Sequence, residues 1–219
     1  MQITNTIDIL LKNAYRNDVI LFESRDPQET DIFIPMSGLY ELTAVGSGGG
    51  ADGGCYHKGS HHGKHYTRHQ TGRGGGSGAA FKGKVYLQRG AYVITVGGIG
   101  TGAGRGGKGG NIGGNGGNAT LSLKETGEVI VSAKGGNGSG AISAALCHRN
   151  ASWPATPGVG GIVEVSDRYI FKDIEIQQNG LNGVGVSGGN SVFSGTDYGK
   201  GGDADGGSGN AGYVKLVMV

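Results

Sequence analysis

The chain has 219 residues, of which 50 are glycine, 4 are proline and only 36% are hydrophobic, so its composition excludes a conventional hydrophobic core in proportion to its length. Its formal net charge of +2 comes from interspersed acidic and basic residues, and this balance points to neither DNA, a membrane surface nor an acidic substrate as partner. Two cysteines are too few for a disulfide scaffold.

The first 30 residues have a mixed composition that differs from the rest of the chain. Residues 2–24 contain the apolar runs IDILL and VILF, which are compatible with helix or strand. The sequence QITNTIDILLKNAY lacks the basic leader, long apolar run and cleavage site of a signal peptide, and no stretch is long enough to cross a bilayer. We therefore expect a chain that does not use the secretory route. Residues 1–30 are expected to form an attachment segment and residues 31–219 one glycine-rich domain.

From residue 31 onward, the sequence predicts short strands separated by glycine. In LYELTAV, for example, Tyr40, Leu42 and Ala44 alternate with their neighbours and share one face. The expected strands cover residues 32–35, 39–45, 79–87, 91–96, 119–123, 128–133, 161–166, 169–176, 191–193 and 213–219. Many short strands without a sustained helical period predict an all-β fold with an antiparallel, jelly-roll-like β-sandwich as its body.

Glycine between these strands recurs with a period of three. The longest register is Gly104, Gly107, Gly110, Gly113 and Gly116, and a second is Gly206, Gly209 and Gly212. Three residues per turn is the period of the polyproline II conformation, so the sequence predicts polyglycine II helices that hydrogen-bond to one another. Collagen shares the period but needs abundant proline. A flexible glycine linker is the alternative.

Four segments carry a resemblance to a known family. They are IFIPMSGLYELTAVGSGGGADGG, FKGKVYLQRGAYVITVGGIGTGAG, GGNATLSLKETGEVIVSAKGGNGSG and GSGNAGYVKLVMV, in this order within residues 31–219. They resemble the glycine-rich domain of bacteriophage tail-fibre and tail-tip adhesin proteins. The resemblance implies a β-sandwich body with polyglycine II segments, loops that bind the host surface, other tail proteins as partners and a location in the virion. The stretches NASWPATPG and DRYIFKDIEIQQNG and residues 1–30 depart from the family pattern.

The stretch CYHKGSHHGKHYTRHQTG, residues 55–72, interrupts the glycine runs. It holds five of the six histidines, two tyrosines and several cations. Such side chains supply stacking faces and directional donors, which suit sugars or protein epitopes. We interpret the stretch as a receptor-binding loop, with Tyr56, His57, His61, His62, His65, Tyr66, Arg68 and His69 as its candidate contacts.

Three alternatives remain open for this stretch. A metal site is one, because His57, His61, His65 and His69 recur every fourth residue and would share a helix face. Glycines interrupt such a helix and no carboxylate lies within the stretch to orient an imidazole, so we expect neither metal nor cofactor. A nucleic-acid interface has the right residue types, but the rest of the domain is not basic. The third alternative is a solvated insertion without a role.

A second stretch, LCHRNASWPATPG at residues 146–158, has the same character. Its candidate receptor contacts are His148, Arg149 and Trp153, although a lone tryptophan is also a common core residue. Cys55 and Cys147 are each followed closely by histidine, so we expect both stretches at the same end of the molecule. Proteins assembled in a reducing cytoplasm keep thiols free, and we therefore expect unbonded cysteines.

Nothing in the spacing places a serine-histidine-acid or paired-carboxylate arrangement, so we expect no enzyme. The sequence predicts a phage virion protein that recognises a host cell-surface glycan or protein without inserting into the membrane, with homo-oligomers possible. The alternative is a bacterial glycine-rich surface or structural assembly protein. Because histidine changes charge between pH 5 and 8, host binding should vary with pH if these imidazoles contact the receptor.

Overall fold

The computed structural model describes residues 18–104, 111–140, 156–193, 195–204 and 206–219. These residues form twelve strands and no helix, and every pair of neighbouring strands is antiparallel. The expected all-β fold with an antiparallel sandwich is therefore confirmed. The described ranges contain no apolar helix of membrane-spanning length.

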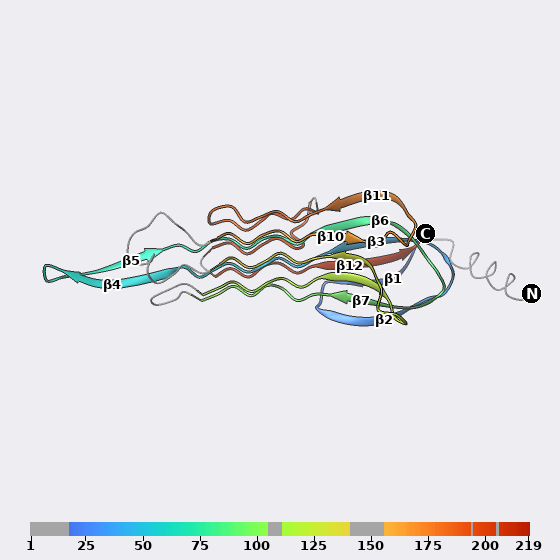
Figure 1. Cartoon of the computed structure of the whole chain (residues 1–219), viewed down its shortest axis with the longest axis horizontal. Coiled ribbons are helices and arrows are strands. Elements are labelled where there is room, and N and C mark those ends of the chain that lie inside the picture. Colours follow the sequence, from blue (N-terminus) through green and yellow to red (C-terminus); the bar gives the residue numbers. More distant parts are fainter. Residues whose placement is uncertain (1–17, 105–110, 141–155, 194, 205) are drawn as a thin grey trace, which may run out of the picture.

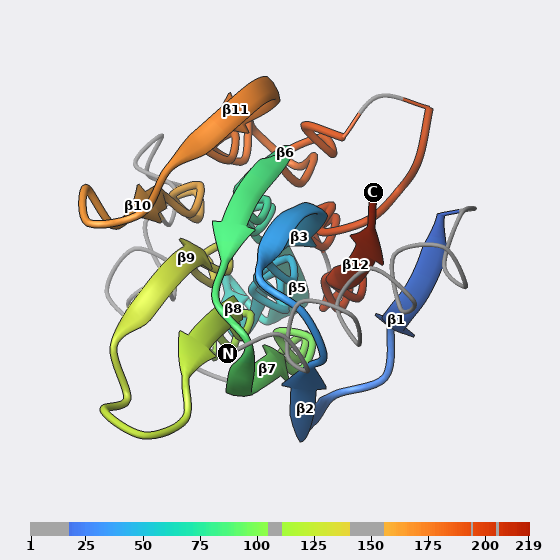
Figure 2. The same cartoon turned by 90° about the vertical axis from the view of Figure 1, so that its right-hand side faces the viewer.

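Two five-stranded sheets face each other and form the sandwich (Figures 1 and 2). The first sheet has the order β1 (Val19–Ser24), β12 (Tyr213–Met218), β3 (Gly38–Val45), β6 (Ala80–Leu87), β11 (Phe171–Gln178). The second sheet has the order β10 (Val163–Val165), β9 (Val129–Ala133), β8 (Ala119–Leu123), β7 (Gly90–Val96), β2 (Gln28–Ile34). The remaining strands, β4 (Cys55–His61) and β5 (Lys64–Gln70), form a separate hairpin.

The hydrophobic core lies between the two sheets. Alternation along β3 buries Tyr40, Leu42 and Ala44, as the sequence predicts, and they pack with residues such as Ile94 of β7 and Leu121 of β8. The hydroxyl of Tyr40 donates to the backbone carbonyl of Met36 at 2.6 Å. The hydroxyl of Tyr92 donates to the backbone carbonyl of Gln88 at 2.9 Å. Each tyrosine thus ties its strand to the turn four residues upstream, which satisfies a buried hydroxyl.

Two expectations about organisation are wrong. The division at residue 31 falls inside β2, and β1 and β2 both pair with strands of the sandwich, so residues 19–30 are part of its sheets. Residues 1–17 lie outside the described part. The expected strand at 191–193 is instead a local turn, because the Ser191 hydroxyl accepts from the Phe193 amide at 3.2 Å.

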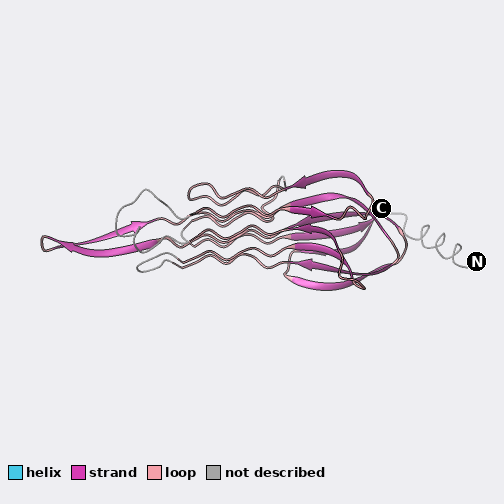
Figure 3. Ribbon diagram, in the orientation of Figure 1, coloured by secondary structure: helices cyan, strands magenta, loops and turns pink. Residues whose placement is uncertain are grey.

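Glycine runs extend from one end of the sandwich as a bundle of wavy, non-strand segments (Figures 1 and 3). Residues 46–52, which we call the central run, show how they are joined. The amides of residues 46, 49 and 52 donate to the carbonyls of one neighbouring run, at residues 79, 76 and 73. The amides of residues 47 and 50 donate to a second run, at carbonyls 117 and 114. The amides of residues 48 and 51 donate to a third run, at carbonyls 210 and 207. Successive amides therefore point to three different neighbours and repeat every third residue, as three residues per turn require.

The central run also accepts from three further neighbours. The amides of Gly100 and Ala103 donate to the carbonyls of residues 48 and 51. The amides of Gly136 and Ser139 donate to the carbonyls of residues 47 and 50, and those of Gly202 and Gly206 donate to the carbonyls of residues 49 and 52. The central run therefore has three neighbouring segments that accept from its amides and three that donate to its carbonyls, and it is surrounded by backbone. The glycine region is thus held by backbone hydrogen bonds in the way the sandwich is held by apolar side chains.

Glycine is required here for close approach. A Cβ at Gly49 would clash with the Asn137 carbonyl, and one at Gly50 would clash with the carbonyl of Thr101. Gly113 and Gly116, from the predicted register, also have backbone where a Cβ would lie, whereas Gly104 has open space there. Gly107 and Gly110 lie outside the described residues.

Asparagines spaced three apart accept from amides at the edge of the bundle. The side-chain oxygens of Asn115 and Asn118 accept from the amides of residues 138 and 135, at 2.9 and 3.1 Å. Asn179 and Asn182 accept in the same way from residues 163 and 160, each at 2.9 Å. At these positions a side-chain amide supplies the carbonyl that a further glycine run would otherwise provide.

Candidate functional site

The histidine-rich stretch forms the hairpin β4–β5 at the far end of the molecule from the sandwich (Figure 1). Its strands continue residues 46–54 and 71–79, which are hydrogen-bonded to each other within the bundle. The sandwich, the glycine region and the hairpin therefore follow one another along the long axis. This order places the hairpin at the tip.

Most of the stretch 55–72, interpreted from the sequence as a loop, forms two paired strands and their turn. His62 and Gly63 both have positive φ, 48° and 72°, and form the two-residue turn of the hairpin. Positive φ at both central residues identifies a type I′ turn, whose twist matches that of antiparallel strands. The strands escape sequence reasoning because their alternation runs among polar residues, without the apolar and polar contrast that marks a half-buried strand.

The base of the hairpin is tied into the bundle by side chains. The Asp52 carboxylate accepts from the Gly54 amide, and the Asp52 amide donates to the Ser139 hydroxyl at 2.6 Å. That hydroxyl in turn donates to the Arg73 carbonyl at 2.7 Å. Ser139 thus bridges the two runs that lead into β4 and β5, and this contact orients the hairpin relative to the glycine region.

Cys55, the first residue of β4, is disulfide-bonded and completely buried. The expectation that its thiol stays free is therefore wrong. The expectation rested on assembly in a reducing cytoplasm, an argument that takes no account of whether the fold brings two cysteines together. Cys147 is the only other cysteine in the sequence and lies outside the described residues.

The hairpin has two faces with different exposure. The side that we call the Tyr56 face carries six exposed residues: Tyr56, Lys58 and Ser60 of β4 with His65, Thr67 and His69 of β5. On the opposite side, which we call the Cys55 face, Cys55 is buried and His57 and Gln70 are half-buried. Alternation along both strands thus divides the predicted receptor contacts between two surfaces.

Aromatic contacts differ between the two faces. On the Tyr56 face, the rings of Tyr56 and His69 are 6.5 Å apart, and the Lys58 ammonium lies 5.9 Å from the Tyr56 ring. On the Cys55 face, the Tyr66 ring lies over Gly59, where a Cβ would meet its hydroxyl end. Tyr66 therefore covers a glycine of the neighbouring strand, although it is as exposed overall as Tyr56.

The register also separates the histidines that a helix would have aligned. His57 and His61 lie on the Cys55 face, and His65 and His69 lie on the Tyr56 face. Among the described residues, no group of three or more histidine, cysteine or acidic side chains is arranged to hold a metal ion. The four-residue spacing therefore does not produce a shared coordination site on a hairpin.

The remaining predicted contacts, His148, Arg149 and Trp153, lie outside the described residues, and the backbone of Arg68 pairs with His57 in the hairpin. The flanks of the second stretch are described. The amide of Gly140 donates to the carbonyl of Thr156 at 2.9 Å, next to the Ser139 that ties the hairpin base.

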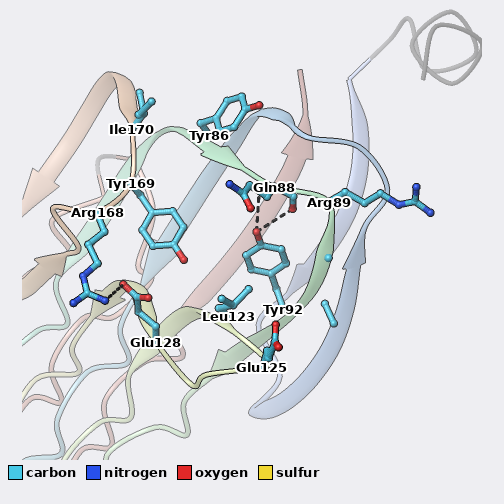
Figure 4. Close-up of a pocket in the computed structure, with 12 residues that line it drawn as sticks. Tyr86, Gln88, Arg89, Tyr92, Leu123, Glu125, Glu128, Arg168, Tyr169 and Ile170 are labelled. Atoms are coloured by element: carbon cyan, nitrogen blue, oxygen red, sulfur yellow. Dashed lines mark hydrogen bonds and ion pairs between the residues drawn. The ribbon is translucent and has the colours of Figure 1, made fainter. Parts of the chain in front are cut away.

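A second candidate site is a cavity of about 550 Å³ at the opposite end of the sandwich (Figure 4). The turns β6–β7 and β8–β9 and the segment before β11 surround it. Sequence reasoning missed it because these three turns are far apart in the chain. Its walls include Tyr86, Tyr92, Leu123, Glu125, Arg168 and Tyr169.

Several polar groups that line this cavity form ion pairs or hydrogen bonds with one another. Arg168 lies 3.6 Å from the Glu128 carboxylate, and the Tyr92 hydroxyl both donates to and accepts from the Gln88 backbone. Burial raises the pKa of Tyr92 and of Tyr169, so both hydroxyls stay protonated to a higher pH than that of an exposed tyrosine. Acidic and basic side chains together give the cavity no single charge preference.

No protein-family model matches the chain, and no curated protein matches its sequence.

Proposed function

We propose that this chain is a non-enzymatic virion protein of a bacteriophage tail, located at a fibre tip or tail tip, that binds a host cell-surface structure through the hairpin β4–β5. Residues 146–158 contribute to the same binding surface. The sandwich end attaches to other tail proteins, with homo-oligomers as a further possible assembly. The alternative is a bacterial glycine-rich surface or assembly protein, for which the hairpin would be dispensable.

The observation that carries this proposal is the position of the hairpin. Exposed tyrosine, histidine and lysine side chains lie at the tip of an elongated molecule, beyond a bundle built mainly of backbone. Val19 pairs with Met218, so β1 begins where β12 ends, at the sandwich end opposite the hairpin. A protein that holds its recognition surface away from its attachment needs this separation.

Recognition energy at interfaces concentrates in a few aromatic and cationic side chains. The exposed fractions of Tyr56 and Tyr66 are 36% and 37%. Tyr86, which is 40% exposed, lies on the sandwich and offers a matched control.

The test is binding of the fluorescently labelled full chain to a panel of bacterial isolates, measured by flow cytometry. On strains that bind it, the double variant Tyr56→Ala/Tyr66→Ala should bind about tenfold or more weakly, while Tyr86→Ala should bind like wild type. Hydrogen exchange of the β4–β5 amides checks that the double variant keeps its hairpin. Equal binding by wild type and a folded double variant would favour the structural alternative.

A further inference from the structure

Charge is distributed unevenly along the chain, although its sum is small. No aspartate or glutamate occurs between Asp52 and Glu125, and this interval includes the whole hairpin with Lys58, Lys64 and Arg68. By contrast, residues 18–41 on the sandwich contain one cationic residue, Arg25. They contain six acidic residues, which are Asp18, Glu23, Asp26, Glu29, Asp31 and Glu41. The tip therefore has an excess of positive charge, and this part of the sandwich has an excess of negative charge.

Elsewhere among the described residues, most cations are neutralised by neighbouring carboxylates. On the sandwich, Lys82 and Lys134 lie 2.6 Å from carboxylates, and Lys84 lies 2.8 Å from one. Among the ion pairs between described side chains, none includes Lys58 or Lys64. Their ammonium groups are available to an external anion.

Of the two hairpin faces, the Tyr56 face is the one suited to a ligand. All six of its side chains are exposed, and each is a potential hydrogen-bond donor: one ammonium, one phenol, two hydroxyls and two imidazoles. The Tyr56 ring adds an apolar surface on which a sugar ring can stack. The Cys55 face also has exposed side chains, those of His61, Lys64 and Tyr66, but toward its base Cys55 is buried and His57 and Gln70 are half-buried, so its exposed surface is shorter.

We infer that the Tyr56 face binds an acidic saccharide, in which sugar rings carry carboxylate or phosphate groups. This inference rests on the proposed function and names the ligand class of the same site. Lys58 contacts the anionic group, because ammonium to carboxylate or phosphate bonds are among the stronger hydrogen bonds. Tyr56, 5.9 Å from that ammonium, stacks on the adjoining sugar ring.

A nucleic acid is the less favoured polyanion. It would extend beyond a hairpin of two seven-residue strands, and the rest of the described molecule offers no continuation of the positive surface, because its cations are largely paired with acids.

The experiment uses saccharide pairs that share a backbone and differ in charge: polygalacturonate against its fully methyl-esterified form, and phosphomannan against mannan. Biolayer interferometry measures their binding to the immobilised full chain at 50 and 300 mM salt. We expect binding to at least one acidic member, no binding to its neutral counterpart, and weaker binding at high salt.

Two lysines of the same hairpin provide the matched variants. Lys58→Gln should weaken binding about tenfold, whereas Lys64→Gln, on the Cys55 face, should change it less than twofold. Equal losses for both variants would mean adsorption to a general positive potential and would overturn the inference.

Four other outcomes would overturn it in distinguishable ways. Equal binding to charged and neutral members would point to sugar recognition without an anion. Binding to a 20-nucleotide single-stranded DNA with the same Lys58 dependence, but not to the saccharides, would make the ligand a nucleic acid. If the chain binds bacterial cells but none of these saccharides, the adhesin proposal stands and the acidic-saccharide inference fails; if it binds no cell either, both fail.

Discussion

At the scale of single residues, the glycine bundle depends on the absence of side chains at particular positions. Gly49 lies inside the bundle, with the Asn137 carbonyl where its Cβ would be. Gly38, at the start of β3, has no atom within 4 Å of the corresponding position. The two glycines therefore differ in what a methyl group would meet.

We predict that Gly49→Ala lowers the free energy of unfolding by about 3 kcal/mol, because neighbouring backbone must move apart. Gly38→Ala should leave it unchanged or raise it by up to about 1 kcal/mol, because alanine loses less conformational entropy on folding. Urea denaturation of both variants checks this. A Gly49→Ala variant as stable as wild type would contradict the close packing of the runs.

The edge asparagines make a second residue-scale prediction. Asn118→Ala removes the side-chain oxygen that accepts a half-buried hydrogen bond from the Gly135 amide, and should lower the free energy of unfolding by about 1 kcal/mol. Asn137 is also exposed and in a glycine run, but its side chain takes part in none of the hydrogen bonds among the described residues, so Asn137→Ala should change stability by less than about 0.5 kcal/mol. Thermal unfolding of the two variants gives the comparison, and equal effects would show that Asn118 has no capping role.

At the scale of elements, the hairpin depends on its two-residue turn. Asparagine tolerates positive φ better than histidine, so His62→Asn should preserve or stabilise the hairpin, whereas Gly63→Val should strain it. We expect the β4–β5 amides of Gly63→Val to exchange at least tenfold faster, with the sandwich amides unchanged. Simultaneous loosening of hairpin and sandwich would instead indicate that the two unfold together.

The glycine runs form the other element whose order can be measured. Amides of residues 46–52 and 113–117 have backbone partners, so their hydrogen exchange should be as slow as that of the sandwich strands. Exchange at the rate of a free peptide across these residues would mean that the bundle does not persist in solution.

At the scale of the whole molecule, buried tyrosines predict a loss of stability at high pH. Burial raises the pKa of Tyr213 well above its ordinary 10.0, and the hydrogen bond that its hydroxyl donates to Glu23 is the second largest cause. Burial also raises the pKa of Tyr40 and of Tyr92. A raised pKa favours the protonated form in the folded state. Its contribution to stability is complete below about pH 10 and declines as the pH rises toward the folded-state value.

We therefore expect the free energy of unfolding to fall steeply between pH 9.5 and 11. Tyr213→Phe should be about 1 kcal/mol less stable at pH 7, because it loses the bond to Glu23, but should show a shallower fall at high pH. The exposed Tyr86→Phe is the control and should keep the wild-type slope. Identical slopes for all three proteins would show that Tyr213 titrates alike in both states.

Much of the sandwich could be predicted from the sequence because strand periodicity is local. Alternation around Tyr40 and Leu42 identifies β3 and its buried face, and the all-β class follows from many such runs. The three-residue spacing of glycine likewise anticipates the repeat in the backbone hydrogen bonds. The prediction of a strand at 191–193 was wrong because the Ser191 hydroxyl accepts from the backbone amide of Phe193, a local bond that strand periodicity does not reveal.

The sequence by itself determined which side chains gather in one stretch: five histidines, two tyrosines and their cations, with no carboxylate before Glu125. Only the tertiary structure decided that this stretch is a hairpin at the tip, that Tyr56 and Lys58 share its exposed face, and that Cys55 is buried at its base. The reason is physical. Composition and periodicity describe neighbours along the chain, whereas exposure and facing depend on the register of paired strands and on the runs that Ser139 bridges.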